Sequence, residues 1–142
     1  MFDDGSGSLL IWRIEDLKKV EIPKDTYGKF YGGDSYIIQY SYTDKGRDKN
    51  LVYFWLGRES SIDERGAAAL LAVSVKDKLK GDPPLCRVVQ GKEPTHFAML
   101  FKGTMCVHSG GKAAGFKNRA DADSYDTDVS APTRIMKFTD LV

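Results

Sequence analysis

One long helical segment between extended segments constrains the fold more than any other feature of the sequence. Over residues 63–80, Leu71, Val75 and Leu79 recur at four-residue spacing, and Ala68 lies beside this stripe. Apolar side chains at this spacing form one face of an α-helix, which must pack on another element. At 1.5 Å per residue the helix is about 27 Å long.

The ends of this helix carry recognisable signals. Ser60 or Ser61 can cap its start, and Asp63 and Glu64 lie in its first turn, where the helix dipole favours negative charge. Gly81 and the prolines after it are expected to end the helix.

Extended segments are expected on both sides of the helix. A hairpin loop is expected over residues 44–49, around Gly46, between two segments rich in aromatic side chains. Strands that alternate with helices predict an α/β (α+β) fold: a mixed sheet with helices on both faces. The expected strands are 9–14, 18–23, 35–43, 50–56, 85–89, 105–108 and 133–138, and a short second helix is expected over 94–101.

Length and composition suit one domain. The 142 residues are 42% hydrophobic and 11% aromatic, which is enough for one packed core. Residues 1–8 contain the run Asp-Asp-Gly-Ser-Gly-Ser and are expected to be a linker or N-terminal tail, with a single domain over 9–142. A linker at this position suggests one module of a longer chain.

The charge balance of the sequence argues against one class of partner. Lys and Arg total 21 and Asp and Glu total 20, so the net charge is +1, which argues against a nucleic-acid-coating role.

No apolar run is long enough to span a membrane, and the N-terminus does not resemble a secretory signal. We expect a cytoplasmic protein in which Cys86 and Cys106 are reduced.

No arrangement of residues supports catalysis. Cys86, His96, Cys106 and His108 fall on separate elements at irregular spacing, unlike the close pairs of a zinc site. No nucleophile-elbow motif is present. We therefore expect that the protein is not an enzyme.

An acidic run follows the last helix. Asp121, Asp123, Asp126 and Asp128 resemble half of a calcium-binding loop, but the turn glycine and closing glutamate of an EF-hand are missing. The alternative is an acidic, mobile loop.

The long helix carries a second face of small and apolar residues. Ala67, Leu70 and Ser74 lie away from the sheet-facing stripe. Either a neighbouring loop covers this face, or it binds a partner.

Several motifs together resemble the repeats of the gelsolin/villin superfamily. Residues 27–38 read Tyr-Gly-Lys-Phe-Tyr-Gly-Gly-Asp-Ser-Tyr-Ile-Ile, residues 63–69 read Asp-Glu-Arg-Gly-Ala-Ala-Ala, and residues 89–94 read Val-Gln-Gly-Lys-Glu-Pro. The resemblance covers about residues 3–138. The opening acidic-glycine run followed by Trp-Arg-Ile-Glu is most similar to the entry of the fourth repeat of villin, gelsolin and adseverin.

This resemblance implies a fold and a function. The gelsolin-like fold is a mixed sheet of five to six strands between one long and one short helix. The resemblance implies a calcium-regulated actin-binding domain of the cytoskeleton, which binds monomers, caps filaments or forms part of a severing protein. The long helix would dock into the cleft between two actin subdomains, and further gelsolin-like repeats can follow in a longer chain.

The resemblance also implies a Ca²⁺ site. Its ligands would be Gly33, Asp34, Glu64 and Lys112, two through carboxylates and two through backbone carbonyls. Calcium prefers several oxygen ligands, so the chemistry is suitable. Taken one at a time, Asp34 and Glu64 can also be read as capping or surface acids.

A second site of the family is shared with actin and uses an acid near the end of the long helix. The matching position here is Lys76, with Gly81 and Pro83 at the later backbone positions. Because an ammonium group cannot bind calcium, we expect this site to be lost or reshaped. One hypothesis is that Lys76 replaces the ion and contacts an acidic group of actin directly.

The segment 110–117 ends in Gly-Phe-Lys and resembles the first and second repeats of the family more than its fourth repeats. Phe116 is either an exposed actin anchor or a core residue. The residues expected to bind actin are Ala67, Leu70, Ser74, Lys76, Gly81, Pro83, Phe116 and Lys117.

The alternative function is an adaptor, structural or phosphoinositide-regulated module with little actin affinity. Lysines near the helix end and in the glycine-rich segment can form a basic patch for anionic lipid, or simply a solvated face. The residues concerned are Lys76, Lys78, Lys80, Lys112, Lys117 and Arg119.

Overall fold

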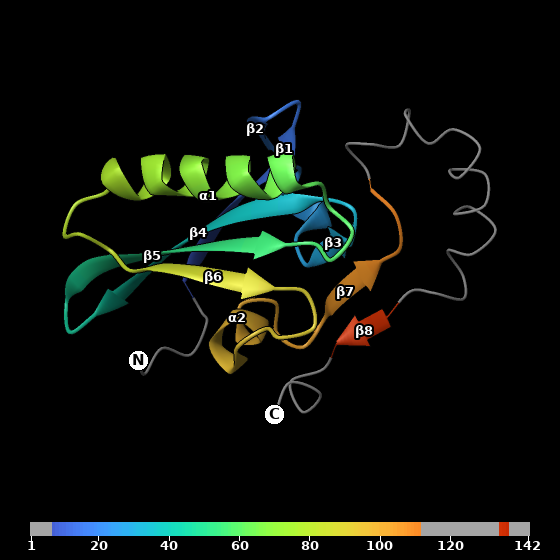
Figure 1. Cartoon of the computed structure of the whole chain (residues 1–142). Coiled ribbons are helices and arrows are strands. Elements are labelled where there is room, and N and C mark those ends of the chain that lie inside the picture. The colour runs from blue at the N-terminus through green and yellow to red at the C-terminus, as the bar shows by residue number, and fades with distance from the viewer. Residues whose placement is uncertain (1–6, 112–133, 137–142) are drawn as a thin grey trace.

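The computed structural model describes residues 7–111 and 134–136, in which two sheets and two α-helices are arranged in layers (Figure 1). No helix in these ranges is long and apolar enough to cross a membrane. The elements are β1 (Ser8–Glu15), β2 (Lys18–Glu21), a 3-10 turn (Lys24–Thr26), β3 (Lys29–Tyr31), β4 (Ser35–Asp44), β5 (Arg47–Leu56), α1 (Ile62–Asp77), β6 (Leu85–Val89), α2 (Thr95–Met99), β7 (Met105–His108) and β8 (Arg134–Met136).

The main sheet is mixed, as expected. Its five strands lie in the order β2-β1-β4-β5-β6, with β6 parallel to β5 and the other pairs antiparallel. A second, three-stranded sheet has the order β3-β7-β8 and pairs β3 with β7 in parallel. The strand β3 was not expected from the sequence, because three residues are too few to show an alternating pattern.

The main sheet is covered on both faces. Along β5, alternate side chains belong to two separate core clusters: Tyr53 and Trp55 pack on the α2 side, and Val52 and Phe54 on the α1 side. Figure 1 shows α1 along one face and α2 against the other. The two-residue alternation of a strand therefore supplies both cores from one segment.

Aromatic rings fill the α2-side core. The ring of Phe30 lies within 4.9–5.9 Å, centroid to centroid, of the rings of Tyr36, Trp55, Phe97 and Phe101. All five residues are buried. Edge-to-face and tilted ring pairs of this kind stabilise a core beyond the area they bury.

Helix α1 starts with a capping box. The Ser61 hydroxyl accepts a hydrogen bond from the backbone N–H of Glu64 at 3.0 Å, and the Glu64 carboxylate accepts from the Ser61 backbone N–H at 3.3 Å. Of the two serines considered, Ser61 is the cap. The hydroxyl of Ser60 is buried and donates to the Gly57 carbonyl instead.

The expectation that α1 runs to residue 80 was wrong. The helix ends at Asp77, and the N–H groups of Lys78 and Leu79 donate to carbonyls three residues back, which tightens the last turn. Leu79 still packs on the α1-side core, as its place in the stripe predicted.

The hairpin loop expected over 44–49 is shorter than predicted. The strands β4 and β5 pair up to Asp44 and Arg47, so that only Lys45 and Gly46 form the turn. Both residues have positive φ, 51° and 78°, which is the backbone twist that a two-residue hairpin requires. Glycine adopts this conformation without cost, and the sequence signal had been the glycine alone.

The capping box gives a first prediction. Ser61→Ala should lower the free energy of unfolding by about 1 kcal/mol, because the Glu64 N–H loses its partner. Urea denaturation followed by circular dichroism measures the change. Ser74→Ala is the matched control, since Ser74 is exposed inside the same helix and alanine has the higher helix propensity. An equal loss in both variants would contradict the role of the cap.

Candidate functional site

The turn between β3 and β4 packs closely on the loop after β7. The N–H of Gly33 donates to the carbonyl of Gly110 at 2.7 Å, and a methyl group on Gly33 would lie 2.9 Å from that carbonyl. A methyl group on Gly111 would lie 2.9 Å from Oδ1 of Asp34. Only glycines allow this approach, which places Gly33, Asp34 and the Gly110–Gly111 backbone side by side.

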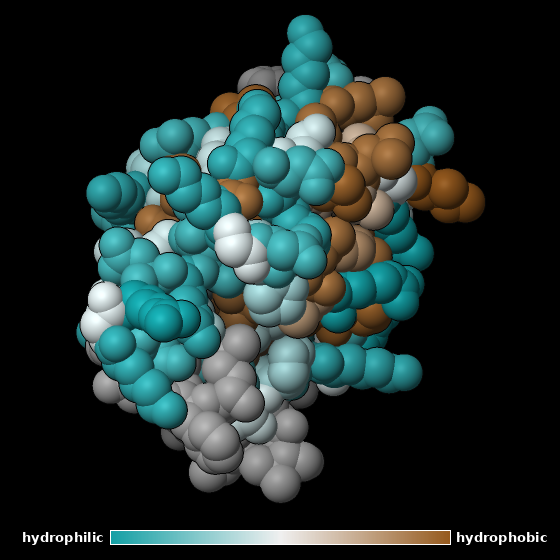
Figure 2. All heavy atoms as spheres, turned by 90° about the vertical axis from the view of Figure 1, so that its left-hand side faces the viewer, coloured by the Kyte–Doolittle hydropathy of each residue, from teal (hydrophilic) through white to brown (hydrophobic). Residues whose placement is uncertain are grey.

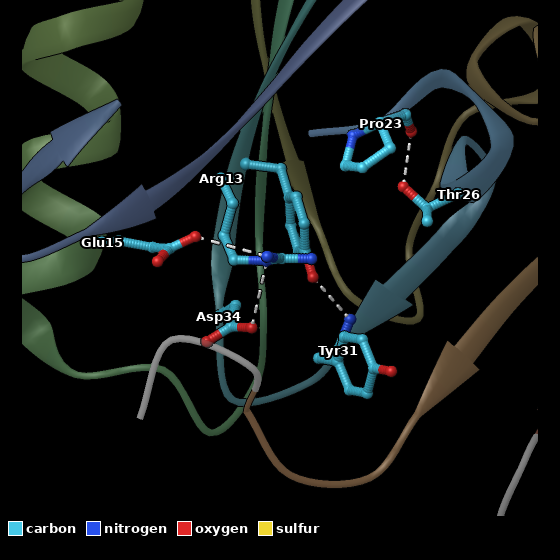
Figure 3. A network of polar contacts seen from close by, with 7 residues as sticks. Arg13, Glu15, Pro23, Thr26, Tyr31 and Asp34 are labelled. Atoms are coloured by element: carbon cyan, nitrogen blue, oxygen red, sulfur yellow. Dashed lines mark hydrogen bonds and ion pairs between the residues drawn. The ribbon is translucent and has the colours of Figure 1, made fainter. Parts of the chain in front are cut away.

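Asp34 is a fully buried carboxylate. Its Oδ2 lies 3.6 Å from Nε of Arg13, whose Nη1 lies 3.3 Å from Oε2 of Glu15. Figure 3 shows the guanidinium of Arg13 between these two acids. A buried charge is costly unless it is paired, so Arg13 makes the buried Asp34 tolerable.

An aromatic ring completes this cluster. The Arg13 guanidinium carbon lies 5.6 Å from the ring centre of Tyr36, and the Tyr36 hydroxyl accepts a hydrogen bond from the Tyr31 N–H at 2.9 Å. Burial raises the pKa of Tyr36, and the negative charge of Asp34 raises it further. The hydroxyl is therefore neutral at physiological pH.

The loop before α1 is tied to the same place. The N–H of Gly57 donates to the Asp34 carbonyl at 3.0 Å, and the hydroxyls of Ser35 and Ser60 are 3.1 Å apart. This loop leads directly into the first turn of α1, which carries Glu64. Both of the capping contacts of Glu64 use Oε1, so the second carboxylate oxygen can still bind a cation.

These groups suit a hard cation. Calcium takes six to eight oxygen ligands, and a buried carboxylate, a helix-start carboxylate and nearby backbone carbonyls are of the right kind. Within residues 7–111 and 134–136, no three His, Cys, Asp or Glu side chains gather into a metal-binding group. Backbone carbonyls would have to complete the set. The predicted fourth ligand, Lys112, lies outside the described residues.

The outer face of α1 is apolar and exposed. Ile62 is 84% exposed, Leu70 74% and Val73 42%, while Ala68 and Ala72 on the opposite face are fully buried. Figure 2 shows apolar side chains gathered in the upper part of one side of the molecule, at the height of α1. No described residue covers Leu70.

The two other residues predicted for this face differ in their exposure to solvent. Ser74 is exposed, in line with the expectation. Ala67 is half-buried and packs against the α1-side core cluster, so it lies between the two faces.

Lys76 has a partner within the chain. Its Nζ donates a hydrogen bond to Oδ1 of Asp82 at 2.5 Å. This contact raises the pKa of Lys76 and lowers that of Asp82. Gly81 is exposed and Pro83 is buried at this end of the helix.

In the described part of the chain the cysteines and histidines do not gather into a metal-binding group. Cys86 and Cys106 are free thiols, and burial raises the pKa of Cys86. His96 Nδ1 forms a 2.7 Å hydrogen bond with the Tyr53 hydroxyl. His108 stacks on Tyr31 in the second sheet. The remaining predicted positions lie outside the described residues: Phe116, Lys117, Arg119 and the acidic run of Asp121, Asp123, Asp126 and Asp128.

Sequence reasoning missed several residues of these sites. Arg13 could have been found, because a charged residue two positions after the core residue Ile11 in a strand faces the same core and needs a buried partner. Ile62 and Val73 extend the pattern of Leu70 on the helix. Asp82 gave no signal, since its contact with Lys76 depends on where the helix ends.

Three comparisons place the chain among known proteins. The family model of the gelsolin repeat matches residues 16–98. Gelsolin of Xenopus laevis is 45% identical over 124 residues, which are 87% of this chain and 30% of that protein. Cytoplasmic gelsolin of Homarus americanus is 44% identical over 128 residues, 90% of this chain and 17% of that protein, and mouse advillin is 43% identical over 111 residues, 78% of this chain and 14% of that protein.

A solved structure agrees with the fold. A chain in the crystal structure of the Thorarchaeota 2DGel3/rabbit actin complex superposes with a TM-score of 0.56 at 27% identity, over 70% of this chain and 45% of that one. The chain thus spans less than a third of the length of the curated relatives it matches. Its correspondence to a fourth repeat stays a prediction. The match over most of the chain, together with the mixed sheet between a long and a short helix, makes this protein a member of the gelsolin repeat family.

Proposed function

We propose that this chain is an actin-binding domain that docks the outer face of α1 on actin and is stabilised by calcium at Asp34. The observation that carries the proposal is the exposed Leu70, 74% exposed on a helix whose other face is already buried. An apolar helix face of this kind is typical of a helix that binds in a groove.

The family relationship supports the choice of partner. The chain belongs to the gelsolin repeat family, and the solved structure that it resembles is of a complex with rabbit actin. Fully burying one leucine stabilises an interface by about 1.5–3 kcal/mol. Ile62, Leu70 and Val73 together can therefore contribute much of the affinity that a monomer-binding or filament-capping domain needs.

Calcium would act through the Asp34 site. The Asp34 turn, the loop before α1 and the first turn of α1 are joined by hydrogen bonds, so a cation held by Asp34 and Glu64 would clamp the start of the docking helix. Calcium would then have a supporting role next to the actin surface. The gelsolin relationship also favours a cytoplasmic, cytoskeletal protein and a role as one component of a severing protein when further repeats are present.

A phosphoinositide-regulated module remains the alternative outcome. In the described part of the chain the lysines at the end of α1 do not form a free basic patch, because Lys76 is paired with Asp82. Lys78 and Lys80 are exposed. Co-sedimentation with phosphoinositide vesicles, set beside the actin assay, separates the two functions.

The test of actin binding is pyrene-actin polymerisation with the chain in calcium and in chelator. We expect slowed assembly in calcium, and we expect Leu70→Glu to lose at least tenfold in potency because a charge would enter the apolar contact. Leu17→Glu is the matched control: Leu17 is 53% exposed, on the β1–β2 turn, and its substitution should change nothing. Equal potency of the Leu70 variant and the parent protein would refute the docking face.

Lys76 gives a separate prediction. If its ammonium meets an acidic group of actin in place of calcium, Lys76→Glu should weaken actin binding several-fold. Asp82→Asn should leave binding unchanged or tighter, because it frees Lys76 from its internal partner. Affinities from labelled-actin titration decide; an unchanged affinity for Lys76→Glu would rule out the replacement of the ion.

Calcium binding is tested by thermal unfolding. Saturating calcium should raise the melting temperature of the parent protein, since a ligand at 100 times its Kd stabilises by about 2.7 kcal/mol. Asp34→Asn should lose this rise. Glu64→Gln is the sharper variant, because glutamine preserves the capping box and removes only the charge. A calcium-dependent rise that persists in both variants would place the ion elsewhere.

A further inference from the structure

The calcium site proposed above contains one residue that is not a ligand and yet touches the principal ligand. Arg13 lies on β1, on the same face of the sheet as Ile11 and Tyr36. Its side chain is 12% exposed and Asp34 is fully buried, so solvent screens their interaction poorly. Nε of Arg13 is buried and makes no hydrogen bond that satisfies it.

The two oxygens of Asp34 have different surroundings. Oδ2 faces Arg13 at 3.6 Å. Oδ1 faces the backbone of Gly111, on the side where the glycines of the two loops meet. One oxygen is thus turned toward the arginine and the other toward the backbone that would supply carbonyl ligands.

We infer that Arg13 is a positioning residue for calcium: it holds Oδ2 of Asp34 so that Oδ1 is directed at the ion. This inference rests on the proposed calcium site. Carboxylate ligands of metals are generally oriented by such outer partners, whose loss typically costs 10–100-fold in metal affinity.

The charge of Arg13 could have the opposite effect, because a cation close to Asp34 repels calcium. Glu15 decides between the two effects. Its carboxylate lies 3.3 Å from Nη1 of Arg13 and is 36% exposed, so it offsets part of the positive charge of Arg13 at the site. We therefore expect the orienting effect to outweigh the repulsion.

The guanidinium is also well anchored. Besides the two acids, it lies 5.6 Å from the ring centre of Tyr36, whose hydroxyl is held by the Tyr31 backbone (Figure 3). A group held from three sides can fix the orientation of a carboxylate, whereas a mobile lysine would not.

The test is isothermal titration with calcium chloride alone, on protein first stripped with chelator. We expect Arg13→Gln to weaken calcium binding by at least tenfold, and Arg13→Lys to fall between this variant and the parent protein. Glu15→Gln should weaken binding a few-fold, because it leaves the positive charge of Arg13 uncompensated. Arg47→Gln, at an exposed position in the β4–β5 hairpin, is the matched control and should bind as the parent does.

A purely structural role would give a different result. Melting in chelator by circular dichroism reports the stability of each variant, and titration is done well below the lowest melting temperature. A lower melting temperature with an unchanged Kd would overturn the inference, and a tighter Kd would show that Arg13 competes with calcium. If Arg13→Gln does not fold, Arg13→Lys decides in the same way, because it keeps the positive charge and removes only the planar guanidinium.

Failure of the proposed calcium site would give a third, distinguishable result in the titration. If neither the parent protein nor any variant binds calcium, the calcium site itself is refuted and the inference falls with it. If the parent protein binds calcium and the Arg13 and Glu15 variants bind it with the same Kd, the calcium site stands and the positioning role of Arg13 does not.

Discussion

The burial of β4 and β5 on both faces determines the arrangement of the other elements. In the paired stretches 36–40 and 51–56 of these strands nearly every side chain belongs to a core, so each face of the sheet needs its own cover. The aromatic face is covered by α2 and the second sheet, and the aliphatic face by α1 (Figure 1). Since a single helix covers the aliphatic face, its opposite side faces solvent, and the apolar residues there have no partner among the described residues. The candidate docking face is thus a consequence of a sheet with two cores.

The buried charge of Asp34 is the second constraint. Asp34 is fully buried beside the close contact of the Gly33 and Gly110 backbones, and its pairing with Arg13 offsets part of the cost of that burial. A site designed for stability alone would carry an apolar residue here, because replacing a buried ion pair by well-packed apolar side chains is often neutral or stabilising. The buried charge of Asp34 is therefore weak evidence for stability, which is consistent with the proposed role of this carboxylate as a calcium ligand.

Most of the fold could be predicted from the sequence, because it is encoded in local patterns. The strand rich in aromatic side chains at 50–56 and the stripe of Leu71 and Val75 in α1 fall within single elements, and both were confirmed. The end of α1 and the length of the β4–β5 turn could not be predicted, since they depend on how the chain reaches the next strand. At the site, motif resemblance predicts Asp34 and Glu64 as calcium ligands, and this stays a prediction. The contacts of Arg13 and Asp82 could not be predicted, because they join residues that are brought together only by tertiary structure. The missed residues are those whose role depends on a partner far away in the sequence.

The proposed calcium site and the candidate docking face meet at one short segment. The loop of residues 57–60 donates a hydrogen bond to the Asp34 carbonyl at one end and leads into the capping box of α1 at the other. Glu64 belongs to both features, since it closes the capping box and is the predicted second carboxylate ligand. A cation that draws Glu64 toward Asp34 would therefore act on the first turn of the helix that carries Ile62 and Leu70. Because helix ends are the least stable part of a helix, the expected effect of calcium is greatest near Ile62 and decreases toward Val73.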